Sequence, residues 1–311
     1  MSGLERKVVL VTRNTRLEEL VHKHLTIEQA KFYVEHLGAD FGDYELEHRT
    51  YMAARNMLVR ALEQTCLVQA IDRKFLPTFL FGPKDIVVAL GQDGIVANTL
   101  KYLNGQLLVG VNPDRHRHDG LLLPFTATEF AQILPDILSG RRPIKAITMA
   151  QASLSNGQTL YAVNDLFVGP KSHTSARYEI ALKERRETQS SSGIIIATGL
   201  GSTAWMRSIF TGAEMLLRQQ ADAKPLAAPS VTMPWDSPYL RFAVREPFPS
   251  VATQTTLVTG HAGKESPLIV RSLMPENGVI FSDGIESDYL EFGSGITARI
   301  GIADRVGQLV H

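Results

Sequence analysis

Apolar residues follow two different patterns in the first half of the chain. Residues 8–11, 86–90 and 107–111 are short continuous apolar runs rich in β-branched side chains, which is typical of strands buried on both faces. Between them, apolar residues recur with helical spacing, in several places over about 16–62 and again over 96–103. Strands that alternate with helices predict a parallel sheet in an α/β layer.

The pattern changes after about residue 140. Short β-like runs then dominate, at hairpin spacing and with Gly, Pro, Asn and Asp between them, which favours antiparallel sheets; one helix is predicted among them, over about Thr203–Gln219. We therefore expect an α/β N-terminal domain over residues 1–140 and a β-rich C-terminal domain, a sheet or sandwich, over residues 141–311. The C-terminal tail could pack back on the first domain.

Composition narrows the class of protein. The chain has 311 residues, with Lys+Arg 32 balanced by Asp+Glu 32, and it contains no apolar run near the ~20 residues that a membrane helix needs. The net charge of +0 argues against a nucleic-acid partner, and the N-terminus has no signal-peptide pattern. The single cysteine, Cys66, is expected in the core. We expect a soluble cytoplasmic protein that binds neither nucleic acid nor membrane.

The first candidate for chemistry is the segment Gly91-Gln92-Asp93-Gly94. It follows a predicted strand and precedes a predicted helix, so backbone N–H groups and the helix N-terminus would face a ligand there. Asp93 could accept a hydroxyl proton, or hold the metal that accompanies a nucleoside triphosphate. A plain strand-to-helix turn is the alternative.

Two later segments are also candidates. Residues 198–204, TGLGSTA, resemble the G-x-G-x-x-G/A dinucleotide fingerprint, but that motif needs an acidic residue at the end of a second strand ~20 residues on. Asp222 has no strand leading to it, so a Rossmann dehydrogenase is disfavoured, whereas a turn presenting donors to a ligand remains. The pair Asn164-Asp165 interrupts an apolar strand and must either turn the chain or contact something.

Two other patterns resemble a P-loop and a metal site but do not meet the requirements of either. Residues 260–266, GHAGKES, are too short for a P-loop, and Lys264 is followed by Glu265 where that motif needs Ser or Thr. His116 and His118 lack a partner cluster at ligand spacing, so we expect loop histidines.

The three candidates, in this order and at these separations, resemble the NAD kinase family. The matching stretches are GQDG at Gly91–Gly94, VND at Val163–Asp165 and TGLGSTAW at Thr198–Trp205. The chain is most similar to the mitochondrial-type branch, through VTRNTRLEEL near the start, GVNPDRHRHDGLLLP, SSGIIIATGLGSTAW and RFAVREPF. The resemblance spans nearly the whole chain.

The resemblance implies a nucleotide-binding α/β domain, a dinucleotide-binding β-domain and transfer of a phosphoryl group from ATP, or polyphosphate, to the adenosine-ribose 2′-hydroxyl of NAD. Mg²⁺ or another divalent metal is implied, with no residue assigned as its ligand, and a homodimer or homotetramer is expected. Asp93 would be the catalytic carboxylate. The implied binding residues are Gly91 and Gly94 at the phosphates, Arg16 as a further phosphate contact, and Asn164, Asp165, Thr203, Ala204, Trp205 and Ser208 at the dinucleotide.

Four departures from the family pattern leave other functions open. Gln92 stands at the second glycine of the family's GGDG, Ile95 at a usual threonine, Leu200 at a hydroxyl-bearing position, and Ser192 where many bacterial members carry aspartate. A related kinase of a sugar, nucleoside or lipid hydroxyl is one alternative. A non-catalytic dinucleotide-binding protein is the other.

Overall fold

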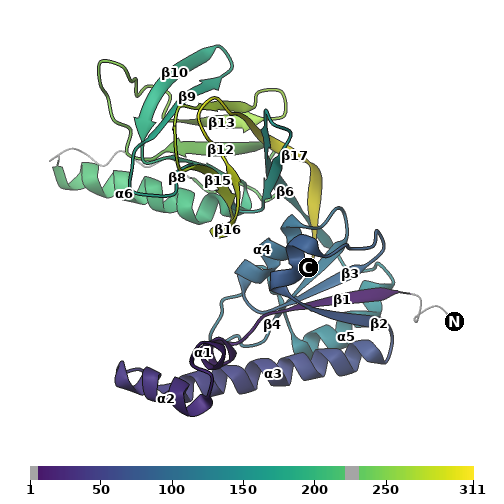
Figure 1. The fold of residues 1–311 in the computed structure, drawn as a ribbon. Helices are drawn as coiled ribbons and strands as arrows, with labels where there is room; N and C mark the ends of the chain where they lie inside the picture. Colours follow the sequence, from purple (N-terminus) through teal and green to yellow (C-terminus); the bar gives the residue numbers. More distant parts are fainter. Residues whose placement is uncertain (1–5, 221–230) are drawn as a thin grey trace. The chain divides into compact units, whose positions relative to one another are not determined.

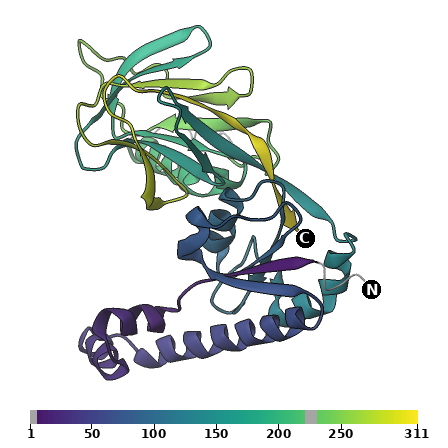
Figure 2. The same ribbon diagram turned by 45° about the vertical axis from the view of Figure 1, so that its right-hand side comes forward.

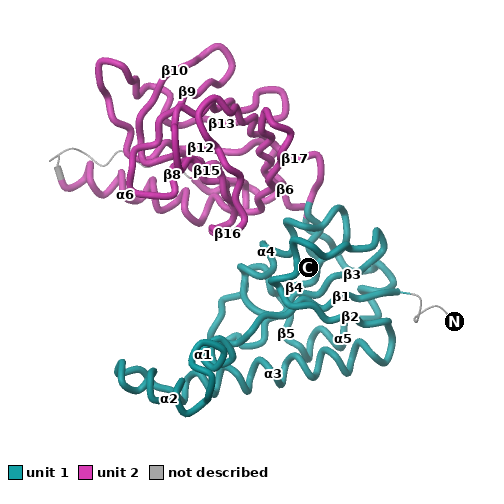
Figure 3. Tube along the Cα trace, in the orientation of Figure 1, with its two compact units in different colours: residues 1–145, 307–311 teal, residues 146–306 magenta. Residues whose placement is uncertain are grey.

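The computed structural model describes residues 6–220 and 231–311, and these form two compact units (Figure 3). Unit 1 contains residues 1–145 and 307–311, and unit 2 contains residues 146–306. The last strand, β17 (Thr297–Val310), belongs to both units, since its final residues are part of unit 1. Each unit is described by itself below.

Unit 1 is built on a parallel sheet with the strand order β2-β1-β3-β4. The end of β17 and the short β5 both pair with β4, also in parallel. The strands are β1 (Lys7–Thr12), β2 (Leu67–Asp72), β3 (Ile86–Leu90), β4 (Leu107–Asn112) and β5 (Phe125–Thr126). The predicted parallel α/β layer is thus confirmed, and β1, β3 and β4 contain the three predicted buried runs.

The helices of unit 1 cover both faces of this sheet (Figures 1 and 2). α3 and α5 share one apolar cluster with alternate residues of β1, β3 and β4, whereas α4 lies on the opposite face. The elements are α1 (Arg16–His24), α2 (Ile27–His36), α3 (Phe41–Glu63), η1 (a 3₁₀ helix, Arg73–Thr78), α4 (Asp93–Lys101) and α5 (Ala127–Leu138).

Local conformation explains where these helices begin and end. The helical spacing over about 16–62 becomes three helices, because the chain takes positive φ at Leu25 (71°) and at Gly38 (75°). The helix predicted over 96–103 begins earlier, at Asp93, since the chain enters α4 directly from the turn that follows β3. That turn therefore supplies the helix N-terminus.

The strand order places a topological switch point between β1 and β3. From β1 the chain crosses to β2 on one side, and from β3 it crosses to β4 on the other. The loops that leave the carboxyl ends of β1 and β3 therefore diverge, and open α/β sheets bind ligands in the crevice that this creates. Residues 13–15 and 91–92 leave the two strands at this point.

Unit 2 is a pair of sheets packed face to face. One is six-stranded and antiparallel, with the order β13-β12-β11-β8-β15-β16; in the other, β10, β9, β14 and β17 pair in antiparallel order and β6 pairs with both β17 and β7. A single buried apolar cluster draws on both sheets, for example Ile196 and Phe242 from one and Tyr178 and Val270 from the other. The predicted β-rich architecture is confirmed.

The strands of unit 2, besides β17, are β6 (Ile144–Leu154), β7 (Thr159–Ala162), β8 (Asp165–Pro170), β9 (Ala176–Leu182), β10 (Arg185–Ser191), β11 (Ile194–Ala197), β12 (Tyr239–Val244), β13 (Thr259–Gly263), β14 (Leu268–Ser272), β15 (Gly278–Ser282) and β16 (Ile285–Glu291). The predicted helix is split into η2, a 3₁₀ turn (Leu200–Thr203), and α6 (Trp205–Gln220). Met206 of α6 packs on the outer face of the six-stranded sheet against Phe167 and Ile195.

Candidate functional site

The turn after β3 has the geometry of an anion-binding loop. Gly91 has φ 156°, and a Cβ there would lie 3.1 Å from Ile95 Cγ2, so a side chain would be strained and crowded. Gln92 is the N-cap of α4, and its side chain makes no capping hydrogen bond. The positive end of the α4 dipole is therefore free of a side-chain cap at the switch point.

Asp93 is the first residue of α4, and its carboxylate is held by the backbone. Its Oδ1 accepts a hydrogen bond from the Leu122 N–H at 2.8 Å, and the residue is half-buried. The segment that carries Leu122 is anchored at Asn112, whose Nδ2 donates to the His118 carbonyl at 3.0 Å and whose Oδ1 accepts from the Asp114 N–H at 2.9 Å. This arrangement fixes one oxygen of Asp93.

Three arginines pair with two carboxylates of α3, and one of them, Arg13, also lies beside the Gly91 turn. Arg13 donates to Glu47 at 2.8 Å, while Arg16 and Arg117 both pair with Asp43, at 2.7 and 2.6 Å. The two guanidinium hydrogen bonds, that of Arg117 first, hold the pKa of Asp43 well below its usual range. The predicted phosphate contact of Arg16 stays a prediction, since its guanidinium is engaged by Asp43 in this structure.

Arg13 was not predicted from the sequence, although it lies beside the phosphate loop. Its side chain is only 9% exposed, and its Nε lies 3.5 Å from where a Cβ of Gly91 would be. No described residue accepts a hydrogen bond from that Nε. The signal in the sequence was its place directly after β1, at the carboxyl end of a buried strand, where α/β sheets collect functional groups.

In unit 2, the predicted polar pair forms the turn between β7 and β8. The Asp283 carboxylate accepts hydrogen bonds from the backbone N–H groups of Val163, Asn164 and Asp165, at 2.6 to 3.3 Å. Asp283 itself has φ 56°, and its N–H donates to the Asp165 carbonyl at 3.0 Å. Asp283 was not predicted as a site residue, because nothing in the local sequence indicates which N–H groups its carboxylate will cap.

The Asp165 side chain is unusual in being buried without a hydrogen bond. It is 6% exposed, and among the described residues none donates a hydrogen bond to its carboxyl. Burial, and then the negative charge of Asp283, raise the pKa of Asp165 to about 7. The carboxyl is thus poised between its neutral and charged forms near neutral pH.

Asp165 should make the stability of the protein fall as pH rises. Its pKa is about 7 in the folded protein against 3.8 ordinarily, so between these values the folded state holds a proton that the unfolded state has lost. The free energy of unfolding is therefore expected to decrease from about pH 4 to about pH 7, by on the order of a few kcal/mol. Urea unfolding of wild type and Asp165→Asn across this pH range measures this decrease. The free energy of unfolding of the variant, relative to that of wild type, should increase with pH. A difference that stays constant with pH would contradict the raised pKa of Asp165.

The TGLGSTAW segment packs closely on that turn. A Cβ on Gly201 would lie 1.9 Å from the Asn164 carbonyl oxygen, so only glycine permits this approach. Thr198 donates from its Oγ1 to the Val163 carbonyl at 2.5 Å and from its N–H to the Asn164 carbonyl at 2.9 Å. The segment forms a 3₁₀ turn, with no βαβ unit of the Rossmann type; Asp222, weighed for that motif, lies outside the described residues.

The remaining predicted residues follow this turn. The ring of Trp205 stacks on Phe167, with centroids 5.8 Å apart and planes inclined by 6°, and the guanidinium of Arg245 lies 5.2 Å from the centre of the Trp205 ring. Thr203, Ala204 and Ser208 are exposed. The structure thus gathers the predicted residues into two groups. Arg16, Gly91, Asp93 and Gly94 lie in unit 1, and Asn164, Asp165, Thr203, Ala204, Trp205 and Ser208 lie in unit 2.

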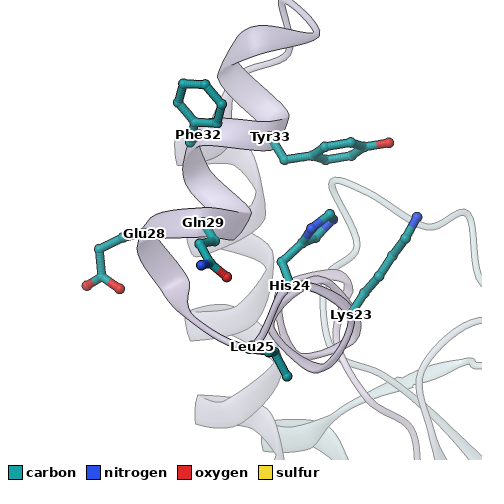
Figure 4. A pocket seen from close by; sticks show the side chains of 7 residues that line it. All are labelled: Lys23, His24, Leu25, Glu28, Gln29, Phe32 and Tyr33. Carbon is teal, nitrogen blue, oxygen red and sulfur yellow. The ribbon is translucent and has the colours of Figure 1, made fainter.

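Other features do not add to these groups. Among residues 6–220 and 231–311, no three His, Cys, Asp or Glu side chains form a metal-holding cluster, and no helix is long and apolar enough to span a membrane. A hollow of about 570 Å³ lies over α1 and α2 (Figure 4). No predicted site residue lines it, and its Tyr33 ring is already in contact with His24 and Lys23.

Solved structures define the class of fold. An NAD kinase from Archaeoglobus fulgidus, crystallised in complex with ATP, aligns with a TM-score of 0.56 and 14% identity over 98% of this chain and 93% of its own. Yeast NADH kinase, in complex with NADH, aligns with a TM-score of 0.58 and 14% identity over 98% of this chain and 83% of its own. The fold of this chain is that of the NAD kinases.

Sequence comparison points the same way. A probable NADH kinase of rice (Oryza sativa subsp. japonica) is 28% identical over 225 residues, 64% of this chain and 63% of its own. The NAD kinase of Chlorobaculum tepidum is 31% identical over 127 residues, 40% of this chain and 44% of its own. No family model matches the chain. The matched part of the chain spans less than two thirds of the length of these relatives. The predicted resemblance to NAD kinases is confirmed, whereas its assignment to the mitochondrial-type branch stays a prediction.

Proposed function

We propose that the chain is an NAD kinase, which transfers the γ-phosphoryl group of ATP to the adenosine-ribose 2′-hydroxyl of NAD and releases NADP and ADP. The observation that carries the proposal is the position of Asp93. Its carboxylate stands at the N-terminus of α4 beside the Gly91 turn, where a proton acceptor and a phosphate-binding loop are adjacent. The sequence relatives named NAD kinase and NADH kinase support the same reaction.

Asp93 would act as the general base. One carboxylate oxygen would take the proton of the 2′-hydroxyl while the hydroxyl oxygen forms a bond to the γ-phosphorus and the bond from that phosphorus to the ADP oxygen breaks. The Leu122 N–H holds the other oxygen at 2.8 Å, which fixes the orientation of the carboxylate without consuming its basic site.

The start of α4 would stabilise the phosphates. Its uncapped N–H groups and its dipole favour negative charge, and Gly91 lets the backbone approach a phosphate closely. Mg²⁺ would be brought by the triphosphate, since this ion is commonly held largely by substrate phosphates and water, and it would neutralise part of the phosphate charge. Such a metal needs no cluster of protein ligands, in agreement with the described residues.

Unit 2 would bind the dinucleotide. The stacked pair of Trp205 and Phe167 offers an apolar surface suited to a purine, and the neighbouring Asn164, Thr203 and Ser208 supply polar groups. Gly94 would complete the phosphate loop. That the protein works in the cytoplasm as a homodimer or homotetramer is part of the same proposal, and it rests on the family resemblance.

The test is direct. Purified protein is incubated with NAD, ATP and Mg²⁺, and NADP is measured by an enzymatic-cycling assay. We expect NADP to accumulate. If neither NAD nor NADH is phosphorylated with ATP or polyphosphate, the proposal is wrong. A thermal-shift assay then separates the two alternative functions. A non-catalytic dinucleotide-binding protein is stabilised by NAD, whereas a kinase of another hydroxyl is stabilised by its own acceptor.

A further inference from the structure

A small polar cavity of about 200 Å³ opens in unit 1 at the carboxyl ends of β1 and β2. These ends are in register, since Thr12 pairs with Asp72 and the Thr12 Oγ1 donates to the Ile71 carbonyl at 3.2 Å. The cavity is smaller than the roughly 300–1,000 Å³ that encloses a whole drug-sized ligand, so it suits one part of a nucleotide. Its lining includes Thr12, Arg13, Asn14, Tyr51, Arg55 and Asp72.

Two half-buried charged side chains in this cavity have groups available to a ligand. Asp72 uses Oδ1 to accept from the Lys74 N–H at 2.9 Å, and no described residue donates to its Oδ2. The guanidinium of Arg55, on α3, makes no hydrogen bond or ion pair with a described residue, in contrast to Arg13, Arg16 and Arg117 nearby. A carboxylate oxygen and a guanidinium that both face one cavity can bind a hydroxyl group and a phosphate.

The cavity and the phosphate loop have one neighbour in common, Arg13. This side chain lines the cavity, and its Nε lies 3.5 Å from the position of a Cβ on Gly91. A ligand whose phosphates lie at the start of α4 can therefore extend its next group toward Asp72. In dinucleotide-binding α/β folds, an acidic residue at the end of the second strand binds ribose hydroxyls, and Asp72 occupies that position in β2.

We propose that this cavity is the ribose subsite of the phosphoryl donor. Asp72 Oδ2 accepts hydrogen bonds from the ribose hydroxyls, and Arg55 donates to the phosphate attached to the ribose. The inference rests on the proposed kinase function and extends it, because a subsite that binds ribose selects a nucleoside triphosphate over a bare polyphosphate chain.

The experiment measures binding without turnover. Isothermal titration with NAD absent compares Mg–ATP with Mg–2′,3′-dideoxyATP on the wild-type chain and on Asp72→Asn. Asparagine keeps a carbonyl oxygen to accept from the Lys74 N–H but loses the charged acceptor for ribose. We expect wild type to bind ATP about tenfold more tightly than dideoxyATP, the scale of a charge-assisted hydrogen bond, and Asp72→Asn to lose that preference.

Matched variants control for folding and charge. Asp40→Asn changes the carboxylate that caps Gly42 at the start of α3, outside the cavity, and should leave the tenfold preference intact. Arg55→Gln should weaken ATP and dideoxyATP equally, because it removes a phosphate contact, whereas Arg60→Gln on the same helix should change neither. Circular dichroism verifies that each variant is folded.

The outcomes separate this inference from the proposed function. If wild type binds ATP and dideoxyATP equally, or if Asp72→Asn keeps the preference, the ribose subsite is wrong, even when NADP is formed. If the preference is present and depends on Asp72 while no NADP is formed, the ribose subsite stands and the NAD kinase proposal falls. Tripolyphosphate, titrated in parallel, should bind Asp72→Asn at least as tightly as wild type, because the variant removes a negative charge and the ligand has no ribose. A weaker complex with the variant would overturn the ribose assignment.

Discussion

Replacing Asp93 with asparagine is expected to lower the rate of NADP formation by about 10²–10⁴-fold, the usual contribution of a general base. The loss should fall on kcat, since the carboxylate acts on the proton that moves during phosphoryl transfer and not on the resting dinucleotide. Asparagine retains an oxygen that can accept from the Leu122 N–H, so the start of α4 should keep its structure. Steady-state kinetics with NAD and ATP, together with NAD binding by titration, make the measurement.

Asp119→Asn is the matched control. Asp119 is an exposed carboxylate in the 112–122 segment, which also contains Leu122, the hydrogen-bond partner of Asp93. It should retain wild-type kcat. If Asp93→Asn stays fully active, the base must be another group, and Asp165 is the next candidate because burial places its pKa near neutrality. Asp93 would then have only its structural contact with Leu122.

Replacing Gly201 with alanine is expected to abolish NAD binding and to destabilise the protein by about 3 kcal/mol or more. The new Cβ would lie 1.9 Å from the Asn164 carbonyl oxygen, so the TGLGSTAW segment must move away from the turn that carries Asn164 and Asp165. Overpacking of a closed site costs typically ~1–3 kcal/mol, and here the displaced atom is backbone and cannot rotate aside. Urea unfolding and NAD titration report the two losses separately.

Gly212→Ala supplies the control within the same region. Gly212 lies in α6, and a Cβ there would have no atom within 4 Å. Alanine in the middle of a helix should leave NAD binding unchanged and stabilise the protein by up to about 1 kcal/mol. A Gly201→Ala protein as stable and as competent in binding as Gly212→Ala would show that the two turns need not be in close contact.

The sequence by itself determined the layers of the fold and the segments that carry chemistry. Continuous apolar runs identified β1, β3 and β4, because a strand covered by helices on both faces must be apolar throughout. The turn after β3 could be recognised as a loop leading into a helix, since glycine and aspartate are common turn residues and here stand between a strand and a stretch of helical spacing. The order of three short motifs indicated the NAD kinase fold.

Only the tertiary structure decided which side chains meet within each unit. Arg13 and Gly91 are 78 positions apart, and they become neighbours because β1 and β3 pair in parallel. Asp283 caps the Val163–Asp165 turn from more than a hundred residues away. Burial, and then the charge of Asp283, raise the pKa of Asp165, which no local pattern reveals. Local sequence determines the conformation of each element, but contacts between distant elements depend on strand order and register, which follow from packing of the whole unit.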